Sequence, residues 1–337
     1  MKKGCVYGTH RVIEPKGTLP QAAWKLNNDM EIYDNELLID VEVLNIDAAS
    51  FSQISSQVGG DREEIARVIT DTVNERGKQH NPVTGSGGML IGRVIQVGRD
   101  FPGQVEVGDK IATLVSLSLT PLKLEAVHQV NEKSDQLKVT GKAILFASGI
   151  YAQLPDDLPE DFSLAMLDVA GAPAQTAKLV EPGDTVLVIG GGGKSGLLCL
   201  YEAAKRAGVT GNVVGLSRSD GGCERIRCSG LANRVIQADA TKALEVYEKV
   251  QEATGGGLAD ITINCVDVPG TEMASVLATR DGGTVYFFSM ATKFTAAALG
   301  AEGVGKDITM LIGNGYTAGH AEIVLDAARK LKSMGIL

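Results

Sequence analysis

The chain of 337 residues has few of the side chains that form disulfides and metal sites. Its five cysteines are an odd number, and no two of them have the Cys-x-x-Cys spacing of many zinc and redox sites. Only four histidines are present. A disulfide framework and a structural zinc site are therefore not expected, whereas a reducing, cytoplasmic compartment is. The cysteines are Cys5, Cys199, Cys223, Cys228 and Cys265.

The chain also lacks a long hydrophobic segment and an excess of positive charge. No segment approaches the ~18 apolar residues of a membrane span, and no apolar stretch follows the basic N-terminus as it would in a signal peptide. The formal net charge is −9 and the pI is about 5.1. This balance disfavours both nucleic acid and anionic membranes as partners.

Aromatic residues make up only 4% of the chain, whereas glycine is frequent, with 41 residues. A composition rich in glycine and small aliphatic residues is typical of α/β proteins with many tight turns between strands and helices. The length suits roughly two domains, each large enough to bury its own core.

The first part of the chain, up to about residue 145, is predicted to be rich in strands. Residues 4–13 and 36–46 alternate apolar and polar side chains, which predicts half-buried strands. Residues 61–79 have apolar side chains at helical spacing, with Asp61 as the expected N-cap and Gly77 as the expected end. Residues 87–119 contain further β segments punctuated by glycine.

From about residue 150, apolar strands alternate with helices, which predicts a parallel, doubly wound sheet. The expected strands are 185–190, 212–217, 234–237, 259–266, 283–289 and 307–313. The expected helices are 195–208, 221–231, 241–254, 270–279 and 318–334. The acidic, proline-containing segment 155–161 is the expected hinge. We therefore predict domains at 1–152 and 153–317, followed by a C-terminal helical segment, 318–337.

A glycine-rich segment between strand 185–190 and the next helix carries the strongest functional signal. Its spacing is Gly191-x-Gly193-x-x-Gly196, although the neighbouring glycines leave the register open by one residue. Such a bend lets the backbone approach a pyrophosphate, and the start of the helix offers free N–H groups to it. We expect a nicotinamide dinucleotide to contact Gly191, Gly192, Gly193, Lys194, Ser195 and Gly196.

The end of the second strand indicates which dinucleotide is bound. An acidic residue there would favour NAD, but this chain has Ser217, Arg218 and Ser219. An arginine can pair with a 2′-phosphate, so these residues favour NADP; the alternative is that Arg218 is simply solvated. The ends of the fourth and fifth strands are also expected to contact the cofactor. Those residues are Cys265, Val266, Asp267, Ser289 and Met290.

The order of these features resembles the medium-chain dehydrogenase/reductase superfamily. The resemblance rests on GGMLIGRVIQVG, VEVGDKIATL and VLVIGGGGKSGLL. It implies a GroES-like substrate domain before a Rossmann domain, a C-terminal helix that returns towards the substrate domain, and a homodimer. Zinc-dependent members carry Gly-His-Glu-x-x-Gly where this chain has Gly88 and Met89, and residues 44–51 and 167–176 lack the other ligands. The resemblance therefore implies an enzyme without zinc.

Three further stretches resemble the L-erythro-3,5-diaminohexanoate dehydrogenase family of lysine fermentation. They are GTHRVIEPKGTLPQAAWKL, LNIDAASFSQI and GKAILFASGIYAQLPDDLP. The resemblance implies oxidative deamination of the diamino acid at C3 to 5-amino-3-oxohexanoate, with ammonium and a reduced nicotinamide as the other products. It also implies NAD, whereas Arg218 favours NADP, and this conflict stays open. The alternative function is that of a zinc-free, NADPH-dependent enone or quinone reductase.

A diamino acid substrate needs a base and a carboxylate for its ammonium groups. The candidate catalytic residues are Asp47 and Asp168. A turn-capping role is at least as expected for Asp47, and a purely structural role is favoured for Asp168. His10, Arg11 and Lys16 are candidate partners of the substrate carboxylate, although for each of them a solvated basic strand end is the more expected role.

Overall fold

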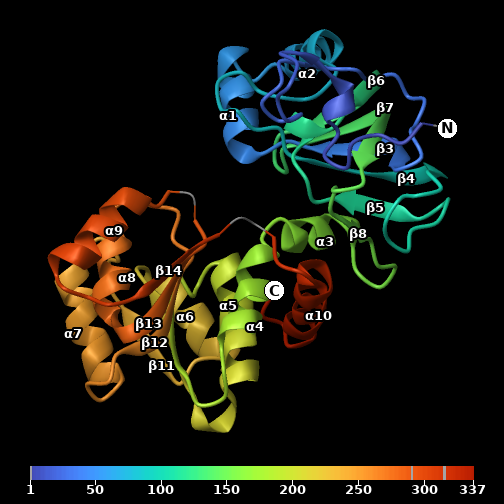
Figure 1. Cartoon of the computed structure of the whole chain (residues 1–337). Helices are drawn as coiled ribbons and strands as arrows, with labels where there is room; N and C mark the ends of the chain where they lie inside the picture. The colour runs from blue at the N-terminus through green and yellow to red at the C-terminus, as the bar shows by residue number, and fades with distance from the viewer. Residues whose placement is uncertain (1, 290, 314–315) are drawn as a thin grey trace. The chain divides into compact units, whose positions relative to one another are not determined.

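The computed structural model describes residues 2–289, 291–313 and 316–337, with the backbone alone at residues 48 and 49 (Figure 1). Its contacts divide the chain into two units, Met1–Asp156 and Asp157–Leu337. The division falls inside the acidic segment expected to be a hinge. The finer borders predicted at residues 152 and 317 stay predictions.

The first unit is built on a six-stranded antiparallel sheet with the order β6-β7-β3-β4-β5-β8. Two helices complete it, α1 (Ala48–Gln57) and α2 (Arg62–Arg76). The apolar side chains of the strands and the two helices form one buried core, which includes Leu44, Phe51 and Ile65. The strands are β3 (Glu36–Asn45), β4 (Met89–Val97), β5 (Lys110–Thr113), β6 (Leu122–Asn131), β7 (Gln136–Phe146) and β8 (Tyr151–Gln153).

Helix α2 forms where its sequence predicts. Asp61 accepts hydrogen bonds from the backbone N–H groups of Glu63 and Glu64, at 2.9 and 3.1 Å, and so caps the first turn. Gly77 ends the helix with a φ of 69°, a left-handed conformation that suits glycine. Ile65 and other apolar residues at helical spacing are fully buried.

One local prediction for the first unit is wrong, and one helix was missed. Residues 4–13 do not form one strand, because Thr9–Arg11 is a short 3-10 helix and only Val12–Glu14 is extended, as β1, which pairs with β2 (Lys25–Leu26). A contact distant in sequence, between Arg11 and Glu36, holds this segment and overrides its alternating pattern. Helix α1 was not expected, because its serine-rich sequence has only a weak apolar pattern.

The second unit contains a six-stranded parallel sheet with the order β11-β10-β9-β12-β13-β14. This is the 3-2-1-4-5-6 order of a Rossmann fold, so the doubly wound sheet predicted from the sequence is confirmed. The first unit supplies the GroES-like β-rich fold. The strands are β9 (Thr185–Ile189), β10 (Asn212–Ser217), β11 (Arg234–Gln237), β12 (Ala259–Asn264), β13 (Thr279–Phe287) and β14 (Thr309–Ile312).

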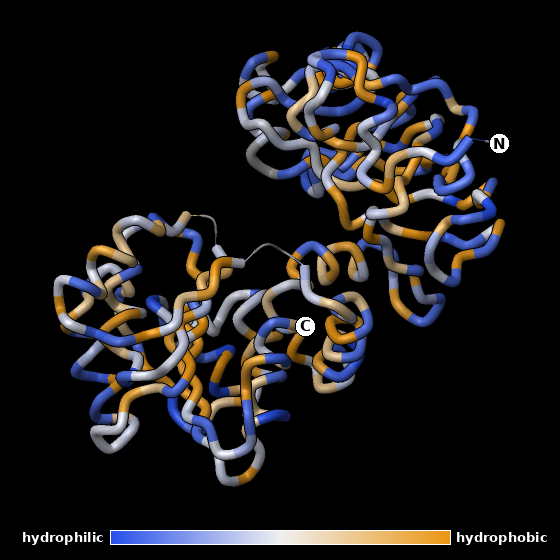
Figure 2. The backbone as a smooth tube through the Cα atoms, in the orientation of Figure 1, coloured by the Kyte–Doolittle hydropathy of each residue, from blue (hydrophilic) through white to orange (hydrophobic). Residues whose placement is uncertain are grey.

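Alternate residues of the parallel strands face two different cores, as the period of two requires. Val186 and Val188 of β9 belong to one core, whereas Leu187 and Ile189 belong to the other. Because both faces of the central strand β9 are covered, four of its five residues are apolar, and hydrophobic residues mark the middle of this unit in Figure 2. The helices are α3 (Glu160–Leu167), α4 (Gly171–Leu179), α5 (Lys194–Ala207), α6 (Asp220–Ser229), α7 (Ala243–Ala253), α8 (Glu272–Ala278), α9 (Phe294–Gly303) and α10 (His320–Ser333).

The last helix, α10, packs against α3, α4 and α5 of its own unit. Helices α3, α4 and α9 were not separately predicted. Among the residues that the structure describes, no helix combines the length and the apolar character that crossing a bilayer requires.

Candidate functional site

The glycine-rich loop connects β9 to α5 through one tight turn. Gly190 has a φ of +85°, and the N–H groups of Gly190 and Gly191 both bond to the carbonyl oxygen of Leu216 at 2.9 Å. The turn therefore begins at Gly190, one residue before the glycine to which the predicted register assigned it. Four consecutive glycines explain why the sequence alone left this register open.

The other glycines of the loop have different physical roles. A Cβ at Gly196 would meet the carbonyl oxygen of Gly190 and lie 2.6 Å from Cα of Gly191, so close packing of the helix on the strand requires glycine there. A Cβ at Gly192 would lie 2.5 Å from the carbonyl oxygen of Gly222. At Gly193, in contrast, the nearest atom to a Cβ would be 3.5 Å away, so the loop is open on this side.

The start of α5 is free to bind an anion. Gly193 is its N-cap residue, and no side chain caps its first N–H groups. Unpaired N–H groups and the positive end of the helix dipole favour a phosphate at such a position. Lys194 and Ser195 form the first turn, and Lys194 Nζ lies 3.6 Å from Oδ2 of Asp168. The structure thus brings Asp168, the C-cap residue of α3, beside the glycine-rich loop.

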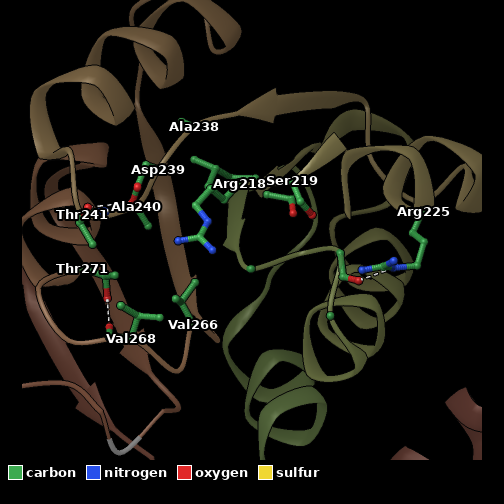
Figure 3. A pocket seen from close by; sticks show the side chains of 15 residues that line it. Arg218, Ser219, Arg225, Ala238, Asp239, Ala240, Thr241, Val266, Val268 and Thr271 are labelled. Carbon is green, nitrogen blue, oxygen red and sulfur yellow. Dashed lines mark hydrogen bonds between the residues drawn. The ribbon is translucent and has the colours of Figure 1, made fainter. Parts of the chain in front are cut away.

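A cavity of about 310 Å³ lies between this loop and the ends of β10, β11 and β12 (Figure 3). We call it the adenosine pocket, because the dinucleotide fold binds its ligands at the carboxyl ends of the strands. Its lining residues are Gly190, Gly192, Gly193, Leu216, Ser217, Arg218, Ser219, Arg225, Ala238, Asp239, Ala240, Thr241, Val266, Val268 and Thr271.

Arg218 extends into the adenosine pocket, and its guanidinium has no hydrogen bond or ion pair within the described part of the chain (Figure 3). Ser219 caps α6 by accepting a hydrogen bond from Gly222 N at 3.1 Å. Asp220, the first acid after β10, does not line the pocket and binds Gln237 Nε2 at 2.7 Å instead. The expected end-of-strand acid is therefore not available to a ribose hydroxyl here.

Two charged residues of the adenosine pocket were missed in the sequence. Arg225 of α6 donates from Nε to the carbonyl oxygen of Gly192 at 2.8 Å and so holds the glycine-rich loop. Asp239 accepts hydrogen bonds from the backbone N–H and the hydroxyl of Thr241, which lower the pKa of its carboxyl. Asp239 follows the end of β11 by two residues, so the rule applied to the other strand ends also points to it. No local signal marks Arg225.

The ends of β12 and β13 place the remaining predicted cofactor residues. Val266 lines the adenosine pocket, and Asp267 accepts a hydrogen bond from Ser289 Oγ at 3.1 Å. Cys265 is not among the lining residues, and its Sγ lies 3.8 Å from Sγ of Cys199, a fully buried residue of α5. Met290 lies outside the described residues.

In the first unit, Asp47 is the N-cap of α1. Its Oδ1 accepts a hydrogen bond from Ser50 N at 3.0 Å, so the expected capping role is present. Its Oδ2 is buried and has no hydrogen-bond partner in the structure. One oxygen of this carboxylate therefore remains to bind a ligand.

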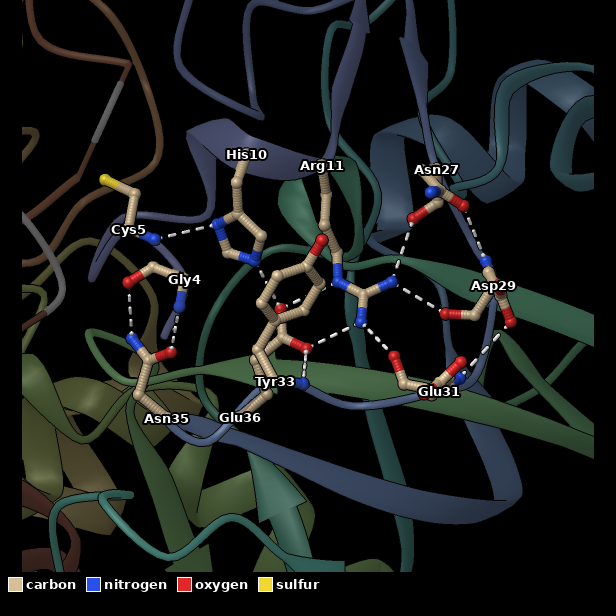
Figure 4. Close-up of polar contacts among 10 residues, drawn as sticks. All are labelled: Gly4, Cys5, His10, Arg11, Asn27, Asp29, Glu31, Tyr33, Asn35 and Glu36. Carbon is tan, nitrogen blue, oxygen red and sulfur yellow. Dashed lines mark hydrogen bonds and ion pairs between the residues drawn. The ribbon is translucent and has the colours of Figure 1, made fainter. Parts of the chain in front are cut away.

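Two of the basic residues near the N-terminus bind a carboxylate of their own chain. Arg11 is buried and donates from Nε and from Nη2 to the two oxygens of Glu36, at 2.7 and 2.6 Å, and His10 Nε2 lies 2.8 Å from the same carboxylate (Figure 4). Burial alone would raise the pKa of Glu36, but the hydrogen bonds from Arg11, His10 and Tyr33 N lower it to about 2. In this structure both side chains anchor the N-terminal segment through Glu36, and their contact with substrate stays a prediction. Lys16 has an exposed side chain.

The residues at the zinc-ligand positions of related enzymes do not fit a metal ion. Gly88 has a φ of +102°, and a Cβ there would meet the carbonyl oxygen of Asn45, so no ligand side chain fits. Within the described residues, no group of three or more His, Cys, Asp or Glu side chains is arranged to hold a metal. A catalytic zinc needs about three such ligands.

Comparisons with known proteins agree with this architecture. A family profile described as the L-erythro-3,5-diaminohexanoate dehydrogenase N-terminal domain matches residues 10–155, and one described as zinc-binding dehydrogenase matches residues 196–303. A quinone oxidoreductase of Pseudomonas syringae has the same fold, with 16% identity and a TM-score of 0.53 over 92% of this chain and 84% of that one.

Two relatives match over nearly their whole length. The L-erythro-3,5-diaminohexanoate dehydrogenase of Acetoanaerobium sticklandii is 59% identical over 97% of this chain and 96% of its own. The enzyme of the same name from Fusobacterium nucleatum is 56% identical over 98% of this chain and 96% of its own. The chain therefore belongs to the L-erythro-3,5-diaminohexanoate dehydrogenase family.

Proposed function

We propose that this chain catalyses the nicotinamide-dependent oxidative deamination of L-erythro-3,5-diaminohexanoate at C3, to 5-amino-3-oxohexanoate and ammonium. The observation that carries the proposal is the identity of 56–59% with two enzymes of that name over nearly the full chain. The glycine-rich loop and the adenosine pocket support a nicotinamide dinucleotide as the oxidant.

The nicotinamide, when bound, supplies the oxidant by accepting a hydride from C3. The amine at C3 must first be neutral, because an ammonium has no lone pair with which to form an imine. We assign Asp47 as the acceptor of this proton, since its Oδ2 is buried and free of other partners while Oδ1 is fixed by Ser50. Water must then add to the imine carbon so that ammonium can leave.

Asp168 is the candidate acid of the second unit. Its ion pair with Lys194 supports a role at the glycine-rich loop, where the carboxylate balances a cation that faces the phosphate-binding turn. We propose that Asp168 keeps Lys194 in place for the cofactor and that its outer oxygen is available to a substrate ammonium.

For the cofactor, we propose a preference for NADP over NAD. Two guanidinium groups, Arg218 and Arg225, line the adenosine pocket, and the acid that would bind a free 2′-hydroxyl is turned away to Gln237. A 2′-phosphate pairs well with arginine. Gly191 to Gly196 would hold the diphosphate, and Asp267 with Ser289 would face the nicotinamide ribose.

A homodimer is a further part of the proposal. Strand β14 is an edge strand of the parallel sheet, and Ile312 on it is 54% exposed. An uncovered apolar edge favours pairing with a second copy. Sedimentation equilibrium of the full chain should give a molecule of twice the chain mass, and a monomer at micromolar concentration contradicts this part.

The function is tested by incubating the purified chain with the diamino acid and each oxidised nicotinamide. The proposal predicts that one ammonium is released for each nicotinamide reduced. The reduction is followed by the absorbance of the reduced nicotinamide ring at roughly 340 nm. A parallel reaction contains reduced nicotinamide and a quinone. Reduction of the quinone without oxidation of the diamino acid would overturn the proposal in favour of an enone or quinone reductase.

A further inference from the structure

Among the described residues of the first unit, three polar side-chain atoms are buried without a hydrogen-bond partner: Asp47 Oδ2, Gln79 Oε1 and His80 Nδ1. Gln79 is only 1% exposed. Leaving a buried polar atom unpaired costs about 1–3 kcal/mol. Three such atoms in one part of a fold are candidates for hydrogen bonds from a bound ligand, as ordered water or a ligand commonly satisfies such groups.

The backbone brings these residues into one loop cluster. A Cβ at Gly87 would lie 2.5 Å from the carbonyl oxygen of Gln79, and a Cβ at Gly88 would lie 2.8 Å from Cα of Ile46, the residue before Asp47. Two adjacent glycines thus separate the backbone of Gln79 from that of Asp47. Larger residues at these two positions would force the two segments apart.

Side chains join the same two segments on another side. Ser50, which holds Asp47 Oδ1 through its N–H, has its Oγ 2.5 Å from Oγ1 of Thr84. The carbonyl oxygen of Ser50 accepts a hydrogen bond from Nδ2 of Asn81 at 3.4 Å. The turn that carries Asp47 and the loop that carries Gln79 and His80 are therefore parts of one hydrogen-bonded arrangement.

The loop 76–81 is held firmly from its far side. The Arg76 guanidinium carbon lies 3.7 Å from the ring centroid of Trp24, and its Nη1 donates to the carbonyl oxygen of His80 at 2.6 Å. Lys78 Nζ, fully buried, donates to the carbonyl oxygens of Pro20 and Gln21 at 2.8 and 3.1 Å. These contacts fix the backbone from which Gln79 and His80 project.

The chemistry of the three unpaired atoms is that of hydrogen-bond acceptors. A carboxylate and an amide oxygen accept, and so does one nitrogen of a neutral imidazole. Burial and then the charges of Lys78 and Arg76 lower the pKa of His80 to about 4, so its ring is neutral at pH 7. A carboxylate ligand would add only further acceptors, whereas a primary amine brings the N–H donors that these atoms lack.

We propose that Gln79 and His80 are specificity-determining residues that, together with Asp47, accept hydrogen bonds from the amino groups of the diamino acid. This inference rests on the proposed function and names the residues that recognise its substrate. Arg76 and Lys78 are positioning residues, which act through the backbone of the same loop.

The test measures steady-state kinetics of the full chain with the diamino acid. Gln79→Met and His80→Leu remove one acceptor each, and each should raise KM about tenfold or more while kcat changes less. His80→Asn restores an acceptor near the position of Nδ1 and should bring KM back to within about threefold of wild type. Ser163→Ala is the matched control, because it removes a buried, unpaired hydroxyl of the second unit and should leave KM unchanged.

A binding measurement separates this inference from the proposed function. In calorimetry without cofactor, wild type should bind 2,4-diaminopentane, which has the two amines without the carboxylate, and Gln79→Met and His80→Leu should weaken this binding about tenfold. If both variants melt at the wild-type temperature and keep wild-type KM and diamine affinity, the inference is overturned. Butyrate, a carboxylate without an amino group, is titrated in parallel. If Gln79→Met and His80→Leu weaken only the binding of butyrate, the inference is overturned in favour of a carboxylate site. Failure of the wild type to oxidise the diamino acid, with diamine binding intact and dependent on these residues, would overturn the proposed function alone.

Discussion

At the scale of single residues, the proposed preference for NADP rests on the charges of the adenosine pocket. Within the described residues Arg218 has no hydrogen bond or ion pair, although its charge helps to lower the pKa of Asp239, whereas Arg225 already donates one hydrogen bond to the glycine-rich loop. Loss of Arg218 should therefore weaken the binding of a 2′-phosphate more selectively than loss of Arg225.

Arg218→Ala should weaken NADP binding by about 1.5–3 kcal/mol and NAD binding far less, because only NADP places a charged group beside the guanidinium. Dissociation constants from titration calorimetry at fixed ionic strength check this. Arg227→Ala is the control, since Arg227 lies on the adjacent helix α6, pairs with Glu224 and does not line the pocket. Equal losses of affinity for NAD and NADP would show that Arg218 does not bind the 2′-phosphate.

Two glycines of the loop should respond differently to alanine. Gly196→Ala should lower the melting temperature by several degrees, because the added methyl meets the backbone of Gly190. Gly193→Ala should leave the melting temperature nearly unchanged, since its φ is −88° and its surroundings are open, but should weaken dinucleotide binding about tenfold or more. Differential scanning fluorimetry with and without cofactor measures both. If the two variants have the same melting temperature and the same affinity for the dinucleotide, these roles of the two glycines are contradicted.

At the scale of elements, helix α2 depends on neighbouring residues, whereas the loop that follows it depends on residues far away in the sequence. The cap at Asp61 and the turn at Gly77 are both readable in the sequence, and both are present in the structure. The loop beyond Gly77 is different, because Lys78 is stabilised by carbonyl groups almost sixty residues away along the chain.

Removing the cap of α2 should cost measurable stability. Asp61→Ala should reduce the free energy of unfolding by about 0.5–2 kcal/mol, because two backbone N–H groups lose their acceptor. Denaturant titration of the full chain checks it. Asp71→Ala, at an exposed position of the same helix, should change stability much less.

Lys78 should make stability depend on pH in the alkaline range. Burial, and then the charge of Arg76, lower the pKa of Lys78 from 10.5 to about 7 in the folded state. Between these two values the unfolded chain binds the extra proton, so stability gains from this group as the pH rises from about 7 towards 10.5. The free energy of unfolding of wild type, relative to that of Lys78→Met, should therefore increase by about 1–2 kcal/mol between pH 7 and pH 9. A difference that stays constant with pH would contradict the burial of a lysine that can lose its proton.

At the scale of the whole molecule, the sequence predicted best where the controlling interactions are local. The glycine-rich loop, the cap at Asp61 and the apolar strands of the second unit are confirmed because each depends on neighbouring residues. The strand expected at residues 4–13 fails because Glu36 binds Arg11 across a long separation in sequence. Arg225 was missed for the same reason: its place in the pocket depends on how α6 packs, which no local pattern reports.

The family assignment and the site therefore rest on different kinds of observation. Identity along nearly the whole chain shows the family. The pocket charges, the free oxygen of Asp47 and the unpaired acceptors of Gln79 and His80 are properties of this chain's own packing. Each unit contributes separately, the second through the adenosine pocket and the first through the loop cluster around Asp47.

The most direct measurement is a crystal structure of the full chain grown with saturating NADP. The account predicts the diphosphate at the N-terminus of α5, against Gly193, and the phosphorylated ribose within reach of Arg218. A dinucleotide bound elsewhere, or an adenosine pocket that stays empty at saturation, would contradict it.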